Sequence, residues 1–200
     1  MTKFEKMDNL LKQQGGILKT TDIINEGISK TYFLDYVNSR NLVRVARGTY
    51  LSQDAWSEWS DWMYLLQIKY KQGVFSHETA LFLHKLTDMK PTQYSMTVKT
   101  GYNPTNMTGA GIKVYTVKKE LHELGIMKVT TPFGYSVNTY NPERTICDIA
   151  RSRSTVGLKV FQNALKQYSG NSNKNLQQLL IYSKQFRIEK ILLQYMEMFL

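Results

Sequence analysis

Residues 27–51, GISKTYFLDYVNSRNLVRVARGTYL, decide the fold of the N-terminal part of this chain. Ser29 is a helix N-cap residue, because its hydroxyl can accept a hydrogen bond from the first helical turn. Helical spacing predicts an inner face made of Phe33, Leu34 and Val37. The outer face then carries Thr31, Tyr32, Asp35 and Ser39. Immediately afterwards, two β-rich runs surround Ala46-Arg47-Gly48, where glycine can adopt the positive φ of a tight hairpin.

Two shorter helices are expected before this stretch. Apolar side chains recur at helical spacing over residues 4–11, and Gly15-Gly16 supplies a left-handed stop. One of the threonines at 20–21 caps a second short helix, which Gly27 ends. Three short helices followed at once by a hairpin predict a winged helix-turn-helix over residues 1–55. A small helical packing module without a nucleic-acid role is the alternative, because the outward carboxylate of Asp35 repels phosphate.

The remainder of the chain has a different pattern. Residues 56–73 are expected to form a connecting helix with one apolar stripe, made of Trp56, Trp59, Trp62, Met63 and Leu66. Over residues 74–200, Ser76 caps a helix, four β-type runs follow at 94–98, 112–117, 126–130 and 135–140, and 101–111 is a loop. Asn141-Pro142 opens a further helix, and two or three helices complete the chain. The predicted fold class is α+β: an N-terminal winged helix-turn-helix and a mixed α/β C-terminal domain with a small sheet and C-terminal helices.

Composition narrows the classes of protein. Of 200 residues, 42% are hydrophobic and 21% charged, which is typical of a folded domain and excludes a disordered tail. No stretch approaches the roughly 20 apolar residues that span a bilayer, and the first residues lack a signal-peptide core, so we expect a cytoplasmic protein without membrane contact. A single cysteine, Cys147, and three histidines are too few for a disulfide framework or a structural zinc site. No metal or other cofactor is therefore expected.

The charge balance favours a polyanionic partner. Lys and Arg number 26 against 16 Asp and Glu, a net charge of +10. Double-stranded DNA is the expected ligand. In the winged part the candidate DNA-binding residues are Lys19, Ser29, Lys30, Thr31, Tyr32, Ser39, Arg40, Arg44 and Arg47. In the second part they are Lys113, Lys118 and Lys119, for which a solvated basic face is an equal alternative.

Catalytic chemistry has little support. Ser76, His77 and Glu78 adjoin, but neighbours on one helical turn point about 100° apart and are not expected to form a relay. His77 and His84 share a helical face but are seven residues apart, whereas ligand pairs on a helix prefer three or four. A nuclease needs clustered carboxylates, and the candidates Glu143 and Asp148 are better explained by a helix in which Arg144 pairs with Asp148. We therefore expect no enzyme.

Four short strings in order resemble the AbiEi antitoxins over essentially the whole chain. They are the turn Gly27-Ile28-Ser29, the hairpin LVRVARGTY at 42–50, SHETAL at 76–81 and PERTICDI at 142–149. The resemblance implies a winged helix-turn-helix that represses its own operon by binding inverted repeats in the promoter. Because each repeat needs one copy, two monomers would pair on the DNA.

The resemblance further implies a C-terminal domain that counters a nucleotidyltransferase toxin, AbiEii, in phage abortive infection. The family is classed as type IV, in which antitoxin and toxin form no stable complex. It supports no catalytic residue. A nucleic-acid-cleaving enzyme and an RNA-binding module remain the alternatives, and a direct complex with the toxin is also open.

Overall fold

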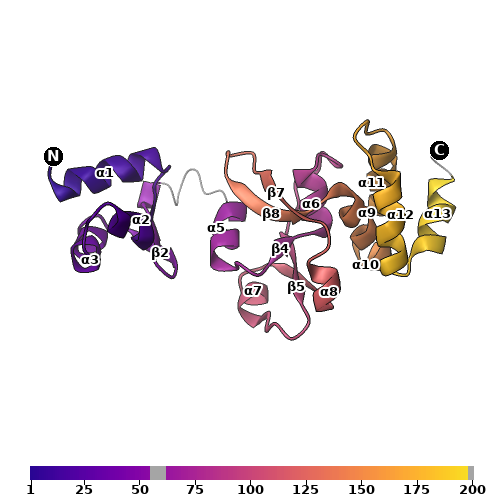
Figure 1. Ribbon diagram of the computed structural model, residues 1–200, viewed down its shortest axis with the longest axis horizontal. Coiled ribbons are helices and arrows are strands. Elements are labelled where there is room, and N and C mark those ends of the chain that lie inside the picture. The colour runs from indigo at the N-terminus through magenta and orange to yellow at the C-terminus, as the bar shows by residue number, and fades with distance from the viewer. Residues whose placement is uncertain (55–61, 198–200) are drawn as a thin grey trace. The chain divides into compact units, whose positions relative to one another are not determined.

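The computed structural model describes residues 1–54 and 62–197. The chain divides into two compact units, residues 1–69 and 70–200 (Figure 1). Both units combine helices with one small sheet, so the α+β prediction is confirmed. Across the described ranges, the helices are all too short or too polar to cross a bilayer.

The first unit contains three helices and a three-stranded antiparallel sheet with the strand order β1-β3-β2. Its elements are α1 (Lys3–Gln13), β1 (Ile17–Lys19), α2 (Thr20–Asn25), α3 (Lys30–Ser39), β2 (Val43–Ala46), β3 (Thr49–Leu51) and, after the undescribed residues, α5 (Trp62–Lys69). The three predicted helices and the hairpin are present. The strand β1 was not predicted; it pairs with β3 and ties the start of the domain to the hairpin.

Local chemistry explains where two helices of the first unit begin. Ser29 caps α3, since its side chain accepts a hydrogen bond from the Tyr32 amide at 3.3 Å, as predicted. Thr2 and Glu5 form a capping box at the start of α1. The predicted threonine cap of α2 is wrong: Lys19 occupies the N-cap position and makes no side-chain cap. The chain enters α2 directly from a paired strand, and the Thr20 amide donates instead to the Gly48 carbonyl at 2.7 Å.

The core of the first unit lies between its helices and the hairpin. Its buried members include Met7, Leu18, Ile23, Ile28, Phe33, Tyr36, Val37, Leu42 and Tyr50. The rings of Phe33 and Tyr50 meet edge to face, 5.2 Å between centroids. This contact fixes α3 against the strand β3.

The predicted connecting helix falls largely on residues that the structure does not describe, Trp56 and Trp59 among them. Its described part is α5, in which Met63 is buried as expected. Trp62, expected in the buried stripe, is 46% exposed.

The second unit is built on a five-stranded mixed sheet with the strand order β6-β5-β4-β8-β7. Strands β5 and β6 are parallel, β4 and β8 are parallel, and the other two neighbouring pairs are antiparallel. The strands are β4 (Val74–Phe75), β5 (Ser95–Lys99), β6 (Lys113–Val117), β7 (Ile126–Thr130) and β8 (Ser136–Tyr140). The four predicted β runs are confirmed, and β4 is additional. The predicted loop at 101–111 contains a short helix, α7 (Thr105–Gly109).

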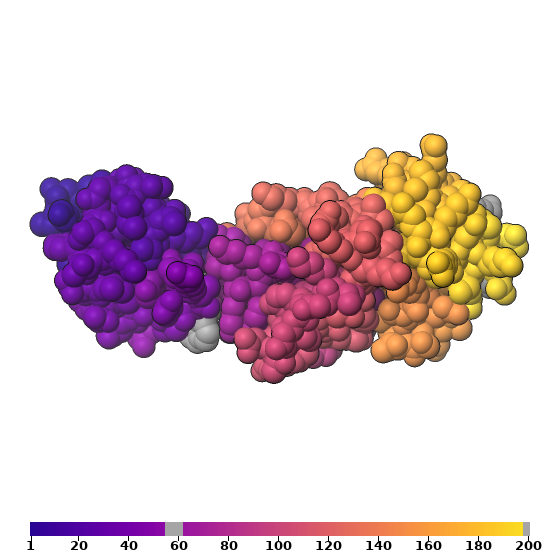
Figure 2. Space-filling view, turned by 60° about the horizontal axis from the view of Figure 1, so that its bottom comes forward, coloured from indigo at the N-terminus to yellow at the C-terminus, as the bar shows by residue number. Residues whose placement is uncertain are grey.

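Helices pack beside this sheet and then form a C-terminal helical part, shown in orange and yellow in Figure 2. The elements are α6 (His77–Leu83), α8 (Lys119–His122), α9 (Pro142–Arg151), α10 (Arg153–Val156), α11 (Leu158–Ser169), α12 (Leu176–Gln185) and α13 (Glu189–Met196). Asn141 caps α9 by accepting from the Arg144 amide at 2.9 Å, and Pro142 is the first helical residue, as predicted. Side chains from α9 are buried almost throughout, so α9 is the central helix of this core.

Candidate nucleic-acid interface

Helix α3 presents one polar face outward. Its buried side chains are Phe33, Tyr36 and Val37. Because successive residues of a helix are rotated by about 100°, the opposite face is made of Thr31, Leu34, Asp35 and Asn38, all exposed. Leu34 was predicted to point inward, and that prediction is wrong: Leu34 is 38% exposed, and Tyr36 takes the buried position.

Tyr36 can be buried because a residue of α1 accepts a hydrogen bond from its hydroxyl. The Tyr36 hydroxyl donates to Asp8 Oδ1 at 2.8 Å. Burial and the neighbouring Asp8 carboxylate together raise the pKa of Tyr36. The same carboxylate accepts two hydrogen bonds from Arg40, Nε at 3.0 Å and Nη2 at 2.6 Å. Although partial burial opposes it, these hydrogen bonds from Arg40 and Tyr36 lower the pKa of Asp8. The hydrogen bonds among Tyr36, Asp8 and Arg40 attach the end of α3 to α1.

Three predicted contact residues on or beside α3 therefore have intramolecular partners. Arg40 is held by Asp8. Tyr32 is half-buried, packs edge to face on Phe4 at 5.5 Å, and has the Lys3 ammonium over its ring. The Ser39 hydroxyl donates to the Tyr36 carbonyl at 2.9 Å. The hydroxyl of Ser29 likewise has an internal partner, the amide of Tyr32, so the role of Ser29 is to cap α3.

The remaining predicted cations of the first unit differ in their surroundings. Lys30, Arg44 and Arg47 are exposed, and within residues 1–54 and 62–197 their side chains make no ion pair or hydrogen bond. Arg47 lies in the turn of the β2–β3 hairpin, beside Gly48 at φ +72°. A side chain at Gly48 would approach Thr20 Oγ1 to 3.3 Å, so glycine suits both the turn and its packing. Lys19 is half-buried and donates to the Tyr64 hydroxyl at 3.1 Å.

In the second unit the three predicted lysines separate into two kinds. Lys113 pairs with Glu78 at 3.1 Å and stands 5.4 Å from the centre of the Tyr115 ring. Lys118 and Lys119, at the start of α8, are exposed, and no described residue pairs with either. The structure therefore leaves Lys118 and Lys119 available for a polyanion and gives Lys113 an internal partner.

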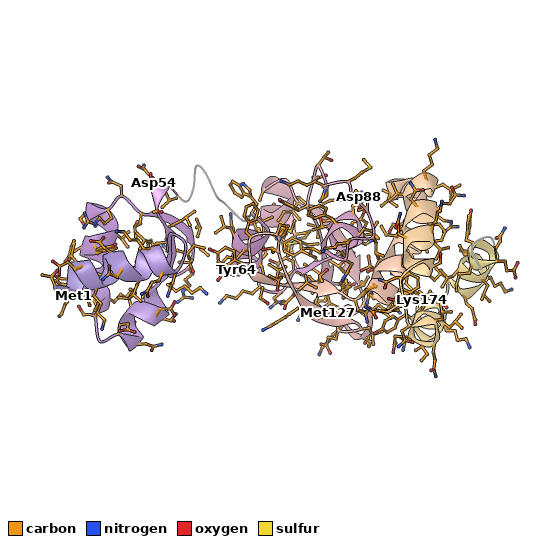
Figure 3. All side chains as sticks on the ribbon, turned by 90° about the horizontal axis from the view of Figure 1, so that it is seen from above. Met1, Asp54, Tyr64, Asp88, Met127 and Lys174 are labelled. Atoms are coloured by element: carbon orange, nitrogen blue, oxygen red, sulfur yellow. The ribbon has the colours of Figure 1, made fainter. Side chains whose placement is uncertain are left out.

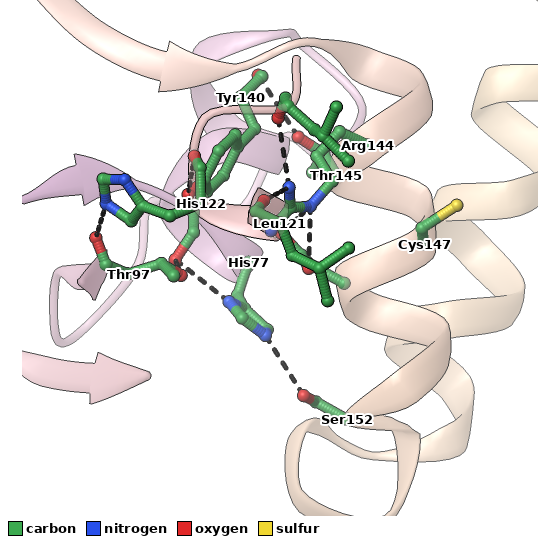
Figure 4. Close-up of polar contacts among 12 residues, drawn as sticks. His77, Thr97, Leu121, His122, Tyr140, Arg144, Thr145, Cys147 and Ser152 are labelled. Atoms are coloured by element: carbon green, nitrogen blue, oxygen red, sulfur yellow. Dashed lines mark hydrogen bonds and ion pairs between the residues drawn. The ribbon is translucent and has the colours of Figure 1, made fainter. Parts of the chain in front are cut away.

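The serine-histidine pair of the second unit is buried and does form a chain of contacts (Figure 4). His77 Nδ1 lies 3.0 Å from Ser76 Oγ, and His77 Nε2 lies 3.1 Å from Ser152 Oγ. Ser76 and His77 are thus in contact although they are adjacent; His77, the first residue of α6, has φ +49°. Glu78 pairs with Lys113 instead. The predicted Ser76 cap is wrong: Ser76 is at the N-cap position, but its hydroxyl contacts His77 and Thr97 and makes no side-chain cap.

This cluster holds elements together rather than facing solvent. The His77 ring stacks on Tyr115, with 3.4 Å between ring centres, and is only 3% exposed. Burial, followed by the charges of Lys113, Arg144 and Arg151, lowers the pKa of His77 well below its ordinary value. The neutral ring therefore joins α6, β6 and the end of α9. His84 has a separate partner, the Tyr140 carbonyl at 2.6 Å.

Glu143 and Asp148, the two acids considered for metal binding, both accept hydrogen bonds from other side chains. The single N–H of Arg144 Nε is shared by both carboxylate oxygens of Asp148, each at 3.1 Å, which confirms the predicted pair and places it in the core. Arg144 also donates to the carbonyls of Leu121 and Leu124. Glu143 accepts from the Tyr168 hydroxyl at 3.1 Å. Among the residues that the structure describes, no group of three His, Cys, Asp or Glu side chains could hold a metal ion.

The sulfur of Cys147 points away from the His77 cluster, toward the C-terminal helices (Figure 4). Cys147 is fully buried, and burial raises the pKa of its thiol. A buried thiol of this kind behaves as a small apolar side chain.

The class of domain follows from the first unit: three helices, a β-hairpin, and an exposed third helix flanked by free cations constitute a winged helix-turn-helix. Comparison with protein families shows which family of winged helix-turn-helix domains this one resembles. Residues 5–53 match the family described as transcriptional regulator, AbiEi antitoxin. The resemblance is thereby confirmed for residues 5–53 of the chain.

A solved structure has a similar fold over both units. The RV2827C protein from Mycobacterium tuberculosis aligns with a TM-score of 0.57 at 12% sequence identity. The alignment covers 94% of this chain and 74% of that protein. At this identity the likeness concerns the fold alone. The search of curated proteins gave no match.

Proposed function

We propose that this protein is a cytoplasmic repressor that binds the promoter of its own operon and acts as the antitoxin to a nucleotidyltransferase toxin of the AbiEii type in phage abortive infection. One observation carries the DNA-binding part. In a domain that matches AbiEi transcriptional regulators, the outward face of α3 and the hairpin cations Arg44 and Arg47 have no internal partner among the described residues.

The division of labour follows the chain. Residues 1–55 bind DNA, residues 56–73 connect, and residues 74–200 provide the antitoxin activity. In a winged helix-turn-helix, the second helix of the motif enters the major groove and the surrounding cations contact phosphates. Two copies occupy an inverted repeat, one on each half-site. Neither unit performs catalysis in this proposal, since the buried His77 chain offers no open position for a substrate.

The test is binding of the full chain to a labelled duplex from the region upstream of its own reading frame. We expect saturable binding at low salt that survives excess unrelated duplex and excess single-stranded RNA. Binding that unrelated DNA abolishes equally would contradict the repressor. Preference for RNA would support the RNA-binding alternative, and magnesium-dependent cleavage of plasmid would support a nuclease.

The antitoxin part is tested in cells. Co-expression with the nucleotidyltransferase encoded beside it should restore growth, while the two purified proteins should elute separately from a size-exclusion column. Rescue combined with co-elution would indicate a direct complex in place of the type IV arrangement. Absence of rescue would contradict the antitoxin role.

A further inference from the structure

The outward face of α3 carries the exposed side chains Leu34, Asp35 and Asn38. We infer that Leu34, Asp35 and Asn38 contact base edges in the major groove: Leu34 the methyl group of a thymine, Asp35 the amino group of a cytosine, and Asn38 an adenine. This inference rests on the proposed function and adds the sequence preference of the same site.

The three side chains lie on the exposed face of α3, together with Thr31. They lie opposite Phe33, Tyr36 and Val37, which are 0%, 0% and 7% exposed. Leu34 and Asn38 are four residues apart, so they stand one above the other, separated by about 6 Å along the helix axis. That distance corresponds to roughly two base-pair steps of about 3.4 Å each. Neighbouring bases are therefore within reach of this one face.

The polar groups of this face are free to bind a ligand. Within residues 1–54 and 62–197, the side chains of Asp35 and Asn38 make no hydrogen bond or ion pair. The side chains around the helix are different, because Tyr32, Ser39 and Arg40 are held by Phe4, the Tyr36 carbonyl and Asp8. Leu34 is an apolar side chain left in solvent among polar neighbours. A ligand with both hydrogen-bonding groups and a methyl group suits this combination.

Helix α3 is also held rigidly. Its start is capped by Ser29, and its far end is tied to α1 through the Tyr36–Asp8–Arg40 group. Rigid placement means that little freedom is lost when the face binds, which favours discrimination between bases.

Known pairings assign the bases. An asparagine amide forms two hydrogen bonds with adenine N6 and N7, a carboxylate accepts from cytosine N4, and apolar side chains contact the thymine methyl. The negative charge of Asp35, which disfavours contact with phosphate, becomes a selective feature in the groove. It attracts the cytosine amino group and repels the acceptor atoms of guanine.

The experiment selects binding sites from a pool of random duplexes with the full chain and with single variants. The wild type should enrich sites containing a cytosine and a nearby A·T step. Asp35→Asn should change the preference at one position from cytosine to adenine, because an amide pairs with adenine. Asn38→Ala should lose its adenine preference by about 5- to 150-fold. Leu34→Ala should lose selection for thymine at a neighbouring position.

The matched control is Asn9→Ala, which removes an exposed asparagine from α1 in the same domain. It should retain the wild-type preference, and circular dichroism should show that every variant is folded. If the wild type binds and selects sites, but Asp35→Asn and Asn38→Ala select the same bases, this inference is wrong and the proposed function stands. If the wild type selects no sequence, both are wrong.

Discussion

The salt dependence of DNA binding separates free cations from those already used inside the protein. We expect Arg47→Ala to weaken binding to every sequence and to flatten its salt dependence. Arg47 lies in the hairpin turn with no partner in the described residues, so each phosphate contact that it makes releases counterions. Arg40→Ala provides the comparison, because Arg40 is held by two hydrogen bonds to Asp8.

The magnitude follows from the number of free cations. Lys30, Arg44 and Arg47 together give a log–log slope of about −2.7 for one protomer on one half-site, at about 0.9 per phosphate contact. Raising salt from 50 to 200 mM should then weaken binding by about 40-fold in the wild type and by about 12-fold in Arg47→Ala.

Fluorescence anisotropy with a single half-site duplex at four or more salt concentrations measures both slopes. Arg40→Ala should leave the slope near the wild-type value and reduce the stability of the first unit. A wild-type slope close to zero, or equal slopes for Arg47→Ala and the wild type, would refute the assignment of the hairpin as a phosphate contact.

Three further outcomes are expected. Arg144→Ala should destabilise the second unit in urea by about 3–5 kcal/mol, because it leaves Asp148 buried without its partner; a loss below about 1 kcal/mol would contradict this. Stability of the second unit should fall as pH drops from 7 to 5.5, since all three histidines have pKa values lowered below 6.5 by burial and the unfolded chain takes up the protons. His77→Gln should reduce that slope, whereas the first unit, which contains no histidine, should show no histidine-dependent loss. Finally, the double variant Lys118→Ala and Lys119→Ala should leave the salt slope unchanged, because the slope of about −2.7 is counted from cations of the first unit alone; a slope lowered by about 1.8 would contradict this.

Features governed by neighbouring residues could be predicted from the sequence. The Ser29 cap, the hairpin turn at Gly48 and the start of α9 at Pro142 each depend on chemistry within a few residues. The same is true of the Arg144–Asp148 pair, whose spacing of four residues brings the groups together on any helix.

Features that depend on distant partners could not be predicted. Tyr36 is buried because Asp8, 28 residues earlier, accepts a hydrogen bond from its hydroxyl. Leu34 is exposed instead. The contact between Ser76 and His77 depends on a positive φ that Ser152 and Tyr115 stabilise from other elements. Asn38 could not be singled out from the sequence, because an asparagine on a helix has no distinctive pattern until the exposed face of α3 is known.

The second unit also keeps apolar side chains at its surface, including Met127 on β7, which is 39% exposed and is labelled in Figure 3. Several of its buried polar groups, by contrast, pair with one another, as Arg144 and Asp148 do.

Hydrogen exchange of the full chain, with and without duplex from its own promoter, tests the central claim most directly. We predict slower amide exchange in α3 and in the β2–β3 hairpin when DNA is bound, with the C-terminal helices unchanged. Protection confined to the second unit, with α3 unaffected, would contradict the account.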